Sequence, residues 1–189
     1  MSNISQLCDE ILRQNSQMNR HVDTVLRPGL SNTEVQTKAS ALPFKVPTSV
    51  QELYGWRDGT TEGSQSLGDM WLLPGYYLLS LEKAIETYHG LLQTLQVWGA
   101  DCLPLLSSGS GDYYGIRCQQ GDDADGPMFE YLGGDPEPQL MFSSLEAMLQ
   151  TCARCFASGI FFLENGVLEI DDDGFDREAA QCDPTVDRE

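Results

Sequence analysis

Residues 42–80 constrain the fold of this chain more than any other stretch. A Leu-Pro pair at 42–43 precedes a short amphipathic segment, and Pro47 suits the first turn of a helix because its missing N–H would have no partner there. The segment ends at Asp58-Gly59, where glycine can adopt the left-handed conformation that follows a helix. An aromatic, apolar run comes next. The stretch therefore predicts a helix, a turn and strands, and it contains no catalytic motif.

Further helices are predicted from apolar residues spaced three and four positions apart and from capping signals. Ser31 and Glu34 form a capping box, in which the hydroxyl and the carboxylate each bond a backbone N–H. Ser80 suits the N-terminus of another helix, and the segment Ser143–Glu146 is a second capping box. Helices are expected at 3–20, at 32–41, after Pro47, after Ser80 and after Ser144.

Strands are predicted where short apolar segments alternate with Gly-, Asp- or Pro-rich turns. Asn165-Gly166 between two apolar runs is the strongest hairpin signal in the chain. The other expected strands cover 70–73, 76–80, 103–106, 113–118, 128–132 and 139–142. Because helices and strands alternate without regular βαβ units, we expect an α+β fold. It would be a single domain whose mixed or antiparallel sheet has helices packed mainly on one face.

The length suits one domain with additional segments at its ends. We expect a helical extension at 1–27, one domain at 28–170, and an acidic tail at 171–189 that is too polar to pack and is therefore disordered. No run of about 18 apolar residues and no apolar block after a basic start is found, which predicts neither a membrane span nor a signal peptide. A cytoplasmic location, with six reduced cysteines, is the expectation.

The chain is strongly acidic, with 11 Lys and Arg against 29 Asp and Glu and a formal net charge of −18. Such a surface repels phosphate backbones and anionic lipids, so we predict no binding to nucleic acid and no binding to membranes. A basic protein partner would be attracted over a long range. The alternative is that the charge serves solubility alone.

Residue patterns that would support catalysis or metal binding are weak. Cys152 and Cys155 form a C-x-x-C inside a helical pattern, so we expect a buried helix face instead of a zinc or redox site. Residues 109–112 lack the spacing of a phosphate-binding loop and predict a tight turn. The acidic run after Gly121 lacks the final glutamate of a calcium loop. We predict no metal, no cofactor and no enzymatic activity.

Several short motifs occur in an order that resembles the SMI1/KNR4 family of the SUKH superfamily. The resemblance covers residues 28–165 and rests on motifs of the following segments: Leu42-Pro43, Leu53–Gly59, Trp71–Leu79, Ser80–Ala84, Leu103-Pro104, Gly111–Tyr113, Gly126–Phe129 and Ser144–Leu149. The resemblance implies a non-enzymatic α+β domain that binds other proteins. One interpretation is a bacterial immunity protein that neutralises a toxin such as a basic nuclease. The alternative is a regulatory or scaffold module in cell-wall synthesis or signalling, without a toxin partner.

In either interpretation we expect the partner-binding surface on loops that carry aromatic and acidic residues. For Trp56, core packing and a partly exposed binding hot spot are both open. The acidic loop at 121–126 is expected nearby. The predicted partner-binding residues are Trp56, Asp58, Glu62, Asp69, Gly111, Asp112 and Tyr113.

Overall fold

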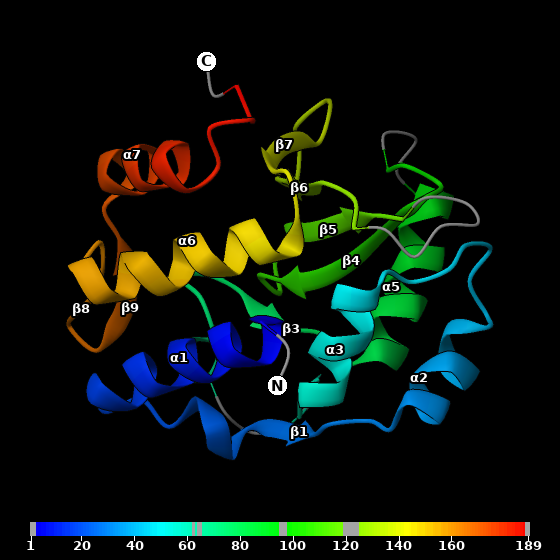
Figure 1. The fold of residues 1–189 in the computed structure, drawn as a ribbon, viewed down its shortest axis with the longest axis horizontal. Coiled ribbons are helices and arrows are strands. Elements are labelled where there is room, and N and C mark those ends of the chain that lie inside the picture. Colours follow the sequence, from blue (N-terminus) through cyan, green and yellow to red (C-terminus); the bar gives the residue numbers. More distant parts are fainter. Residues whose placement is uncertain (1–2, 62, 64–65, 95–97, 119–124, 188–189) are drawn as a thin grey trace.

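The computed structural model describes residues 3–61, 63, 66–94, 98–118 and 125–187 (Figure 1). The described part forms an α+β fold, as predicted. Its α-helices are α1 (Asn3–Gln17), α2 (Asn32–Ala39), α3 (Thr48–Trp56), α4 (Leu67–Met70), α5 (Leu81–Thr94), α6 (Leu145–Ser158) and α7 (Asp172–Cys182). Within this part, no helix combines the length and the apolar character needed to cross a membrane.

Five strands form an antiparallel sheet in which each strand pairs with the next one along the chain. In order they are β3 (Tyr77–Leu78), β4 (Cys102–Ser107), β5 (Tyr113–Arg117), β6 (Met128–Tyr131) and β7 (Gln139–Phe142). Two smaller antiparallel pairs accompany the sheet. They are β1 (Leu26–Pro28) with β2 (Arg57–Thr60), and β8 (Phe161–Glu164) with β9 (Val167–Ile170).

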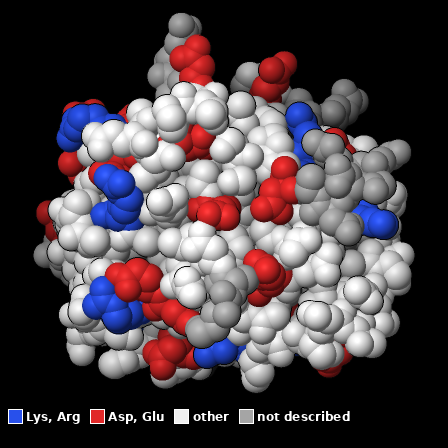
Figure 2. All heavy atoms as spheres, viewed as in Figure 1, with Lys and Arg blue, Asp and Glu red and all other residues white. Residues whose placement is uncertain are grey.

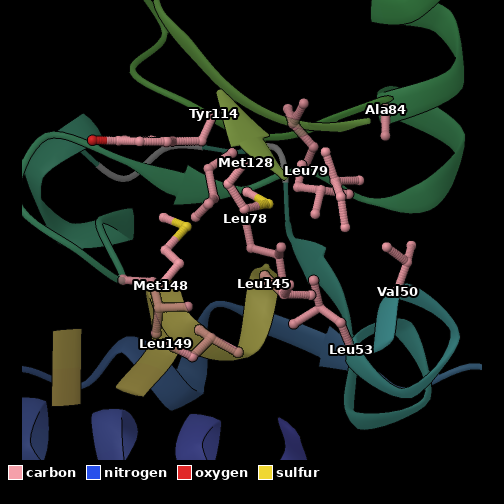
Figure 3. Close-up of a cluster of buried hydrophobic side chains, with 14 of the residues drawn as sticks. Val50, Leu53, Leu78, Leu79, Ala84, Tyr114, Met128, Leu145, Met148 and Leu149 are labelled. Carbon is pink, nitrogen blue, oxygen red and sulfur yellow. The ribbon is translucent and has the colours of Figure 1, made fainter. Parts of the chain in front are cut away.

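One face of the five-stranded sheet is covered by helices. Tyr114 pairs with Glu130, and Ile116 pairs with Met128, so these four side chains share that face. Figure 3 shows Tyr114 and Met128 beside side chains of α3, α5 and α6, including Met148. The Tyr114 hydroxyl points away from the apolar cluster. The core therefore lies between the sheet and these three helices. This confirms the prediction that helices pack mainly on one face of the sheet.

Local signals in the sequence identify several element boundaries correctly. The capping box is present, because the Ser31 side chain accepts from the Glu34 N–H and Glu34 accepts from the Ser31 N–H at 2.8 Å. The hairpin between β8 and β9 also forms, with positive φ angles of 52° at Asn165 and 84° at Gly166. Both signals act between residues close in sequence, which explains why they can be identified without tertiary information.

Two local predictions are wrong. Residues 70–73 are not a strand: α4 ends at Met70, and only an isolated bridge joins Leu73 to Tyr76. The helix α6 is capped by Ser144, whose hydroxyl accepts from the Ala147 N–H at 3.1 Å, and not by a Ser143–Glu146 capping box. The short turn between Leu73 and Tyr76 folds the apolar run back on itself, so a continuous strand cannot form there.

The predicted disordered tail is also corrected, because much of it folds as α7 and packs on α6. Phe175 stacks on Phe161 with a centroid distance of 6.0 Å, and Ala179 is fully buried. Arg154 of α6 forms an ion pair with Glu178. Phe175 and Ala179 are four positions apart and therefore share one face of the otherwise polar helix α7. This apolar face packs on α6 and on Phe161 of β8.

The N-terminal segment is part of the same core. Ile4, Cys8 and Ile11 are buried on one face of α1, which packs along α6 (Figure 1). Asn15 is fully buried, and its side-chain amide donates to the Leu72 carbonyl at 3.3 Å. Removal of α1 would therefore expose core residues of α6, so this helix stabilises the fold in addition to any role in binding.

Asp58 of β2 connects two distant parts of the chain. Its side chain is 1% exposed, accepts from the Leu81 N–H at 2.9 Å, and forms an ion pair with Arg27 at 3.1 Å. Ser80 Oγ accepts from the Lys83 N–H at 3.2 Å. Two of the N–H groups that lack partners at the start of α5 are thus satisfied by side chains.

We expect the substitution Asp58→Ala to lower the free energy of unfolding by about 2 kcal/mol, since it leaves a buried N–H and a cation without their acceptor. The matched control is Asp69→Ala, which removes an exposed aspartate and should change stability by less than about 0.5 kcal/mol. Urea denaturation followed by circular dichroism measures both values. Equal stability of the two variants would contradict a structural role for Asp58.

The cysteines are free thiols, and five of the six are buried. Cys152 and Cys155 lie inside α6, on a buried helix face as predicted. Burial raises the pKa of the Cys155 thiol to about 12 and raises the pKa of Cys152 well above its usual value. The thiolate is the reactive form, so these thiols are inert in the folded protein.

A thiol titration tests this arrangement. In the native protein at about pH 8, we expect Ellman's reagent to label only Cys182 rapidly, because the other thiols are protonated and buried. After denaturation all six thiols should react. Substitution of Cys182 by serine should abolish the rapid phase. Rapid labelling of two or more thiols in the native state would contradict the burial of the other five cysteines.

Candidate partner-binding surface

Trp56 and Asp58 do not reach the surface where a partner could contact them. Trp56 is 8% exposed, and its indole N–H donates to the Asp9 carboxylate of α1 at 2.8 Å. Asp58 is buried between β1 and α5, as described above. Of the two interpretations that the sequence leaves open for Trp56, the structure favours core packing. Both side chains stabilise the fold, Trp56 through its contact with α1 and Asp58 through its contact with α5.

The exposed part of the predicted surface begins at α4. Asp69 is exposed, and its carboxylate accepts from the Ser66 hydroxyl at 2.7 Å. Gly109 lies against the same short helix, because a Cβ atom built there would come within 3.0 Å of a Leu67 methyl group. Gly109 also has a φ of 83°, which glycine adopts readily. The structure thus brings α4 next to the turn at 108–112. Glu62 lies outside the described residues.

The turn at 108–112 is held by Asp112, in agreement with the predicted tight turn. The Ser108 hydroxyl donates to the Asp112 carboxylate at 2.9 Å, and the Asp112 N–H donates back to that hydroxyl at 3.2 Å. The other carboxylate oxygen accepts from the Gly133 N–H at 2.7 Å. Gly111 and Tyr113 are half-buried beside it. Asp112 therefore links two turns and presents a fixed negative charge at this end of the sheet.

A separate cavity of about 310 Å³ lies between the sheet, α6 and α7. At its polar end, the Tyr76 hydroxyl donates to the Glu130 carboxylate at 2.7 Å. The rings of Tyr76 and Tyr114 meet edge to face at 4.7 Å, and Tyr114 is the register partner of Glu130. Burial raises the pKa of Glu130, while the hydroxyl groups of the two tyrosines oppose that shift.

Sequence reasoning missed Tyr76 and Glu130 as candidate site residues. Side chains alternate between the two faces along β5 and β6. Without the strand register, the sequence does not show whether Tyr114 and Glu130 lie on the same face of the sheet. Tyr76 comes from a separate turn more than fifty positions away in sequence. No short motif joins the three residues, so only the folded chain identifies them as a cluster.

Within the described part of the chain, no group of three or more His, Cys, Asp or Glu side chains is arranged to hold a metal ion. The predicted acidic loop at 121–126 lies largely outside that part. Its described residue Asp125 accepts from the Ser49 hydroxyl at 2.5 Å. This contact fixes one end of the loop against α3.

The surface charge is unbalanced. Several basic side chains already pair with acidic side chains of the same protein: Arg13, Arg27, Lys38, Lys83, Arg117 and Arg154. On the face that carries α1 and α6, Figure 2 shows Asp and Glu near the centre and Lys and Arg toward the edges. Internal pairing leaves a large excess of negative charge facing solvent, which favours contact with positively charged surfaces.

Comparison with known proteins identifies the family. A model of the SMI1 / KNR4 family (SUKH-1) matches residues 29–151, which is more than half of the chain and spans β2, α2 to α5 and the whole five-stranded sheet. A search of curated proteins gave no match. The resemblance seen in the sequence motifs is confirmed by this match. The chain therefore belongs to the SMI1/KNR4 family (SUKH-1).

Proposed function

We propose that this protein is a non-enzymatic module that binds a basic protein, and that it acts as an immunity protein against a toxin such as a nuclease. The observation that carries the proposal is the acidic surface formed by the exposed Asp69 of α4 and the half-buried Asp112 of the adjacent turn. A nuclease presents positive charge to the phosphates of its substrate, and an acidic protein can occupy the same groove. The site of action would be the cytoplasm, where free thiols stay reduced.

Family membership supports this proposal. The SMI1/KNR4 family includes toxin immunity proteins, and its members are generally non-catalytic. The partner-binding residues in the proposal are Asp69, Gly111, Asp112 and Tyr113, with Glu62 as a further candidate. Trp56 and Asp58 contact α1 and α5 instead, so they stabilise the fold and are not part of the proposed contact surface.

A regulatory or scaffold module without a toxin partner is the second candidate. One observation favours it: the hairpin β8–β9 exposes Phe162, Leu163 and Val167, each between 37% and 41%. Such side chains can contact a partner through apolar packing, which salt does not weaken. Docking through a free N-terminal helix is less well supported, since the apolar face of α1 already packs on α6.

Affinity capture tests the two candidates. The tagged full-length protein is incubated with lysate of its native host at low and at high salt, and bound proteins are identified by mass spectrometry. One basic protein, recovered in stoichiometric amount and released by salt, is the expected result because long-range attraction between charged surfaces is screened. Partners retained equally at both salt concentrations would contradict the immunity proposal and favour the scaffold.

Charge removal then tests the surface itself. We expect the double variant Asp69→Asn, Asp112→Asn to associate with the captured partner several-fold more slowly at low salt. Electrostatic steering as a whole adds about 10- to 1,000-fold to association rates, and two charges supply part of it. The difference should shrink at high salt, where the Debye length falls to about 3 Å at 1 M. Stopped-flow kinetics gives both rates.

The matched control removes two acidic charges from the hairpin β8–β9, as Glu164→Gln with Glu169→Gln. It has the same net charge as the test variant and should associate at nearly the unaltered rate. If both double variants slow association equally, net charge alone is responsible and the surface at α4 and 108–112 is not the binding site.

A further inference from the structure

We propose that the cavity beside Glu130 receives an arginine side chain of the protein partner. This inference rests on the proposed protein-binding function and adds to it the chemistry of one contact. The cavity combines a carboxylate on β6, aromatic residues from five parts of the chain, and two acidic residues of α7. The size, the acceptor geometry, the walls and the position of the cavity each support an arginine.

The size of the cavity suits one long side chain. At about 310 Å³ it lies at the lower end of ligand pockets, which typically span about 300–1,000 Å³. Apolar residues of the sheet, of α6 and of the hairpin form much of its lining, among them Met141, Met148 and Phe161. An extended aliphatic stem with a charged end would fill such a space, because the stem packs on apolar atoms while the end reaches the polar residues.

The Glu130 carboxylate is oriented and still has acceptor capacity. Tyr76 donates to it at 2.7 Å, and Tyr114 lies beside it as its register partner on β5, so the position of the carboxylate is restrained. A carboxylate offers about four acceptor sites, so sites remain free for a further donor. A guanidinium carries several N–H donors in one plane and can form two parallel hydrogen bonds with such a group.

The walls favour a guanidinium over an ammonium. Phe175 packs against Phe142 at 6.2 Å and against Phe161 at 6.0 Å, and Tyr76 packs against Tyr114 at 4.7 Å. A planar guanidinium stacks on aromatic rings and gives up its hydration more easily than a lysine ammonium does. Arginine therefore matches both the aromatic walls and the planar acceptor.

The remaining charges at the cavity are negative. Asp172 and Asp176 of α7 are exposed and belong to its lining, and no Lys or Arg occurs among the described residues that line it. A cation that approaches the cavity is attracted first by these two carboxylates and then by Glu130. Without a ligand, the burial of Glu130 carries a desolvation cost, which a bound cation would offset.

The position of the cavity indicates a protein side chain as its source. The carboxylate of Asp112, which belongs to the proposed partner surface, accepts from the N–H of Gly133, three positions after Glu130. Leu132, which is 41% exposed, follows the last residue of β6 directly. A partner that covers this surface would meet apolar contacts and the acidic cavity together.

Model peptides test the inference directly. Acetylated and amidated Gly-Arg-Gly is titrated into the 15N-labelled full-length protein, and the same peptide with citrulline serves as the uncharged control of nearly equal shape. We expect the arginine peptide to shift the amide signals of Tyr114, Glu130 and Phe175. The citrulline peptide should bind about tenfold more weakly or worse, the loss expected for a charge-assisted hydrogen bond.

Variants locate the effect. Glu130→Gln should weaken the arginine peptide by about tenfold or more, while the exposed control Glu164→Gln should leave its affinity unchanged. If Glu130→Gln fails to fold, the double variant Asp172→Asn, Asp176→Asn at the exposed mouth replaces it and should weaken binding several-fold. Equal binding of the arginine and citrulline peptides, or unaltered binding by these variants, would overturn the inference.

Two further results separate the inference from the proposed function. Free L-arginine that binds as tightly as the peptide would overturn the assignment to a protein side chain and indicate a small-molecule site. Capture of the basic partner by Glu130→Gln with unaltered affinity would overturn the inference and leave the proposed function standing. A failed capture together with arginine-specific peptide binding would overturn the proposed function and support recognition of guanidinium by the cavity.

The affinity for the arginine peptide should also depend on pH through Glu130. Burial raises the pKa of this carboxyl, so its neutral form persists to higher pH and attracts a cation less. The ionisable groups that face it are Tyr76, Tyr114, Asp112, Asp135, Asp172 and Asp176. From about pH 5 to about pH 7, where exposed carboxyl groups are already ionised, affinity should rise in the unaltered protein. It should stay constant in Glu130→Gln, and a parallel rise in that variant would contradict the role of Glu130.

Discussion

The packing of α6 against one face of the five-stranded sheet is the contact on which the rest of the structure depends. Met148 extends toward the sheet (Figure 3), and Leu149, Cys152 and Cys155 of the same helix are also buried. The helices α1 and α7 pack on α6 in turn, from opposite ends of the sequence. Because these layers share one helix, segments outside the matched family region are joined to the domain through apolar burial.

This architecture also explains how an acidic chain accommodates a half-buried carboxyl group. Glu130 lies on the covered face of β6, where its register partner Tyr114 and the nearby Tyr76 supply hydroxyl groups. A buried carboxylate is costly unless hydrogen bonds compensate it, and here the compensation is partial. Acceptor sites that remain free on Glu130 are therefore available to a cationic group that enters the cavity.

Much of the fold could be predicted from the sequence, because its signals are local. Ser31 and Glu34 are three positions apart, and Asn165-Gly166 forms its turn without help from distant residues. The tail was predicted wrongly since its composition is dominated by acidic residues, although Phe175 and Ala179 are spaced to share a helix face. The stabilisation of α7 comes from α6 and the hairpin β8–β9, and composition alone carries no information on such a partner.

The sequence by itself determined the fold class, the family and most helices and strands of this protein, since periodicity, caps and turns act over a few residues. Tertiary structure decided which acidic and aromatic residues are accessible. It buried Trp56 and Asp58, left Asp69 exposed, and brought Tyr76 to Glu130. Exposure and the meeting of distant side chains depend on strand register and on how the layers pack, and these follow from burial summed over the whole chain instead of from any short motif.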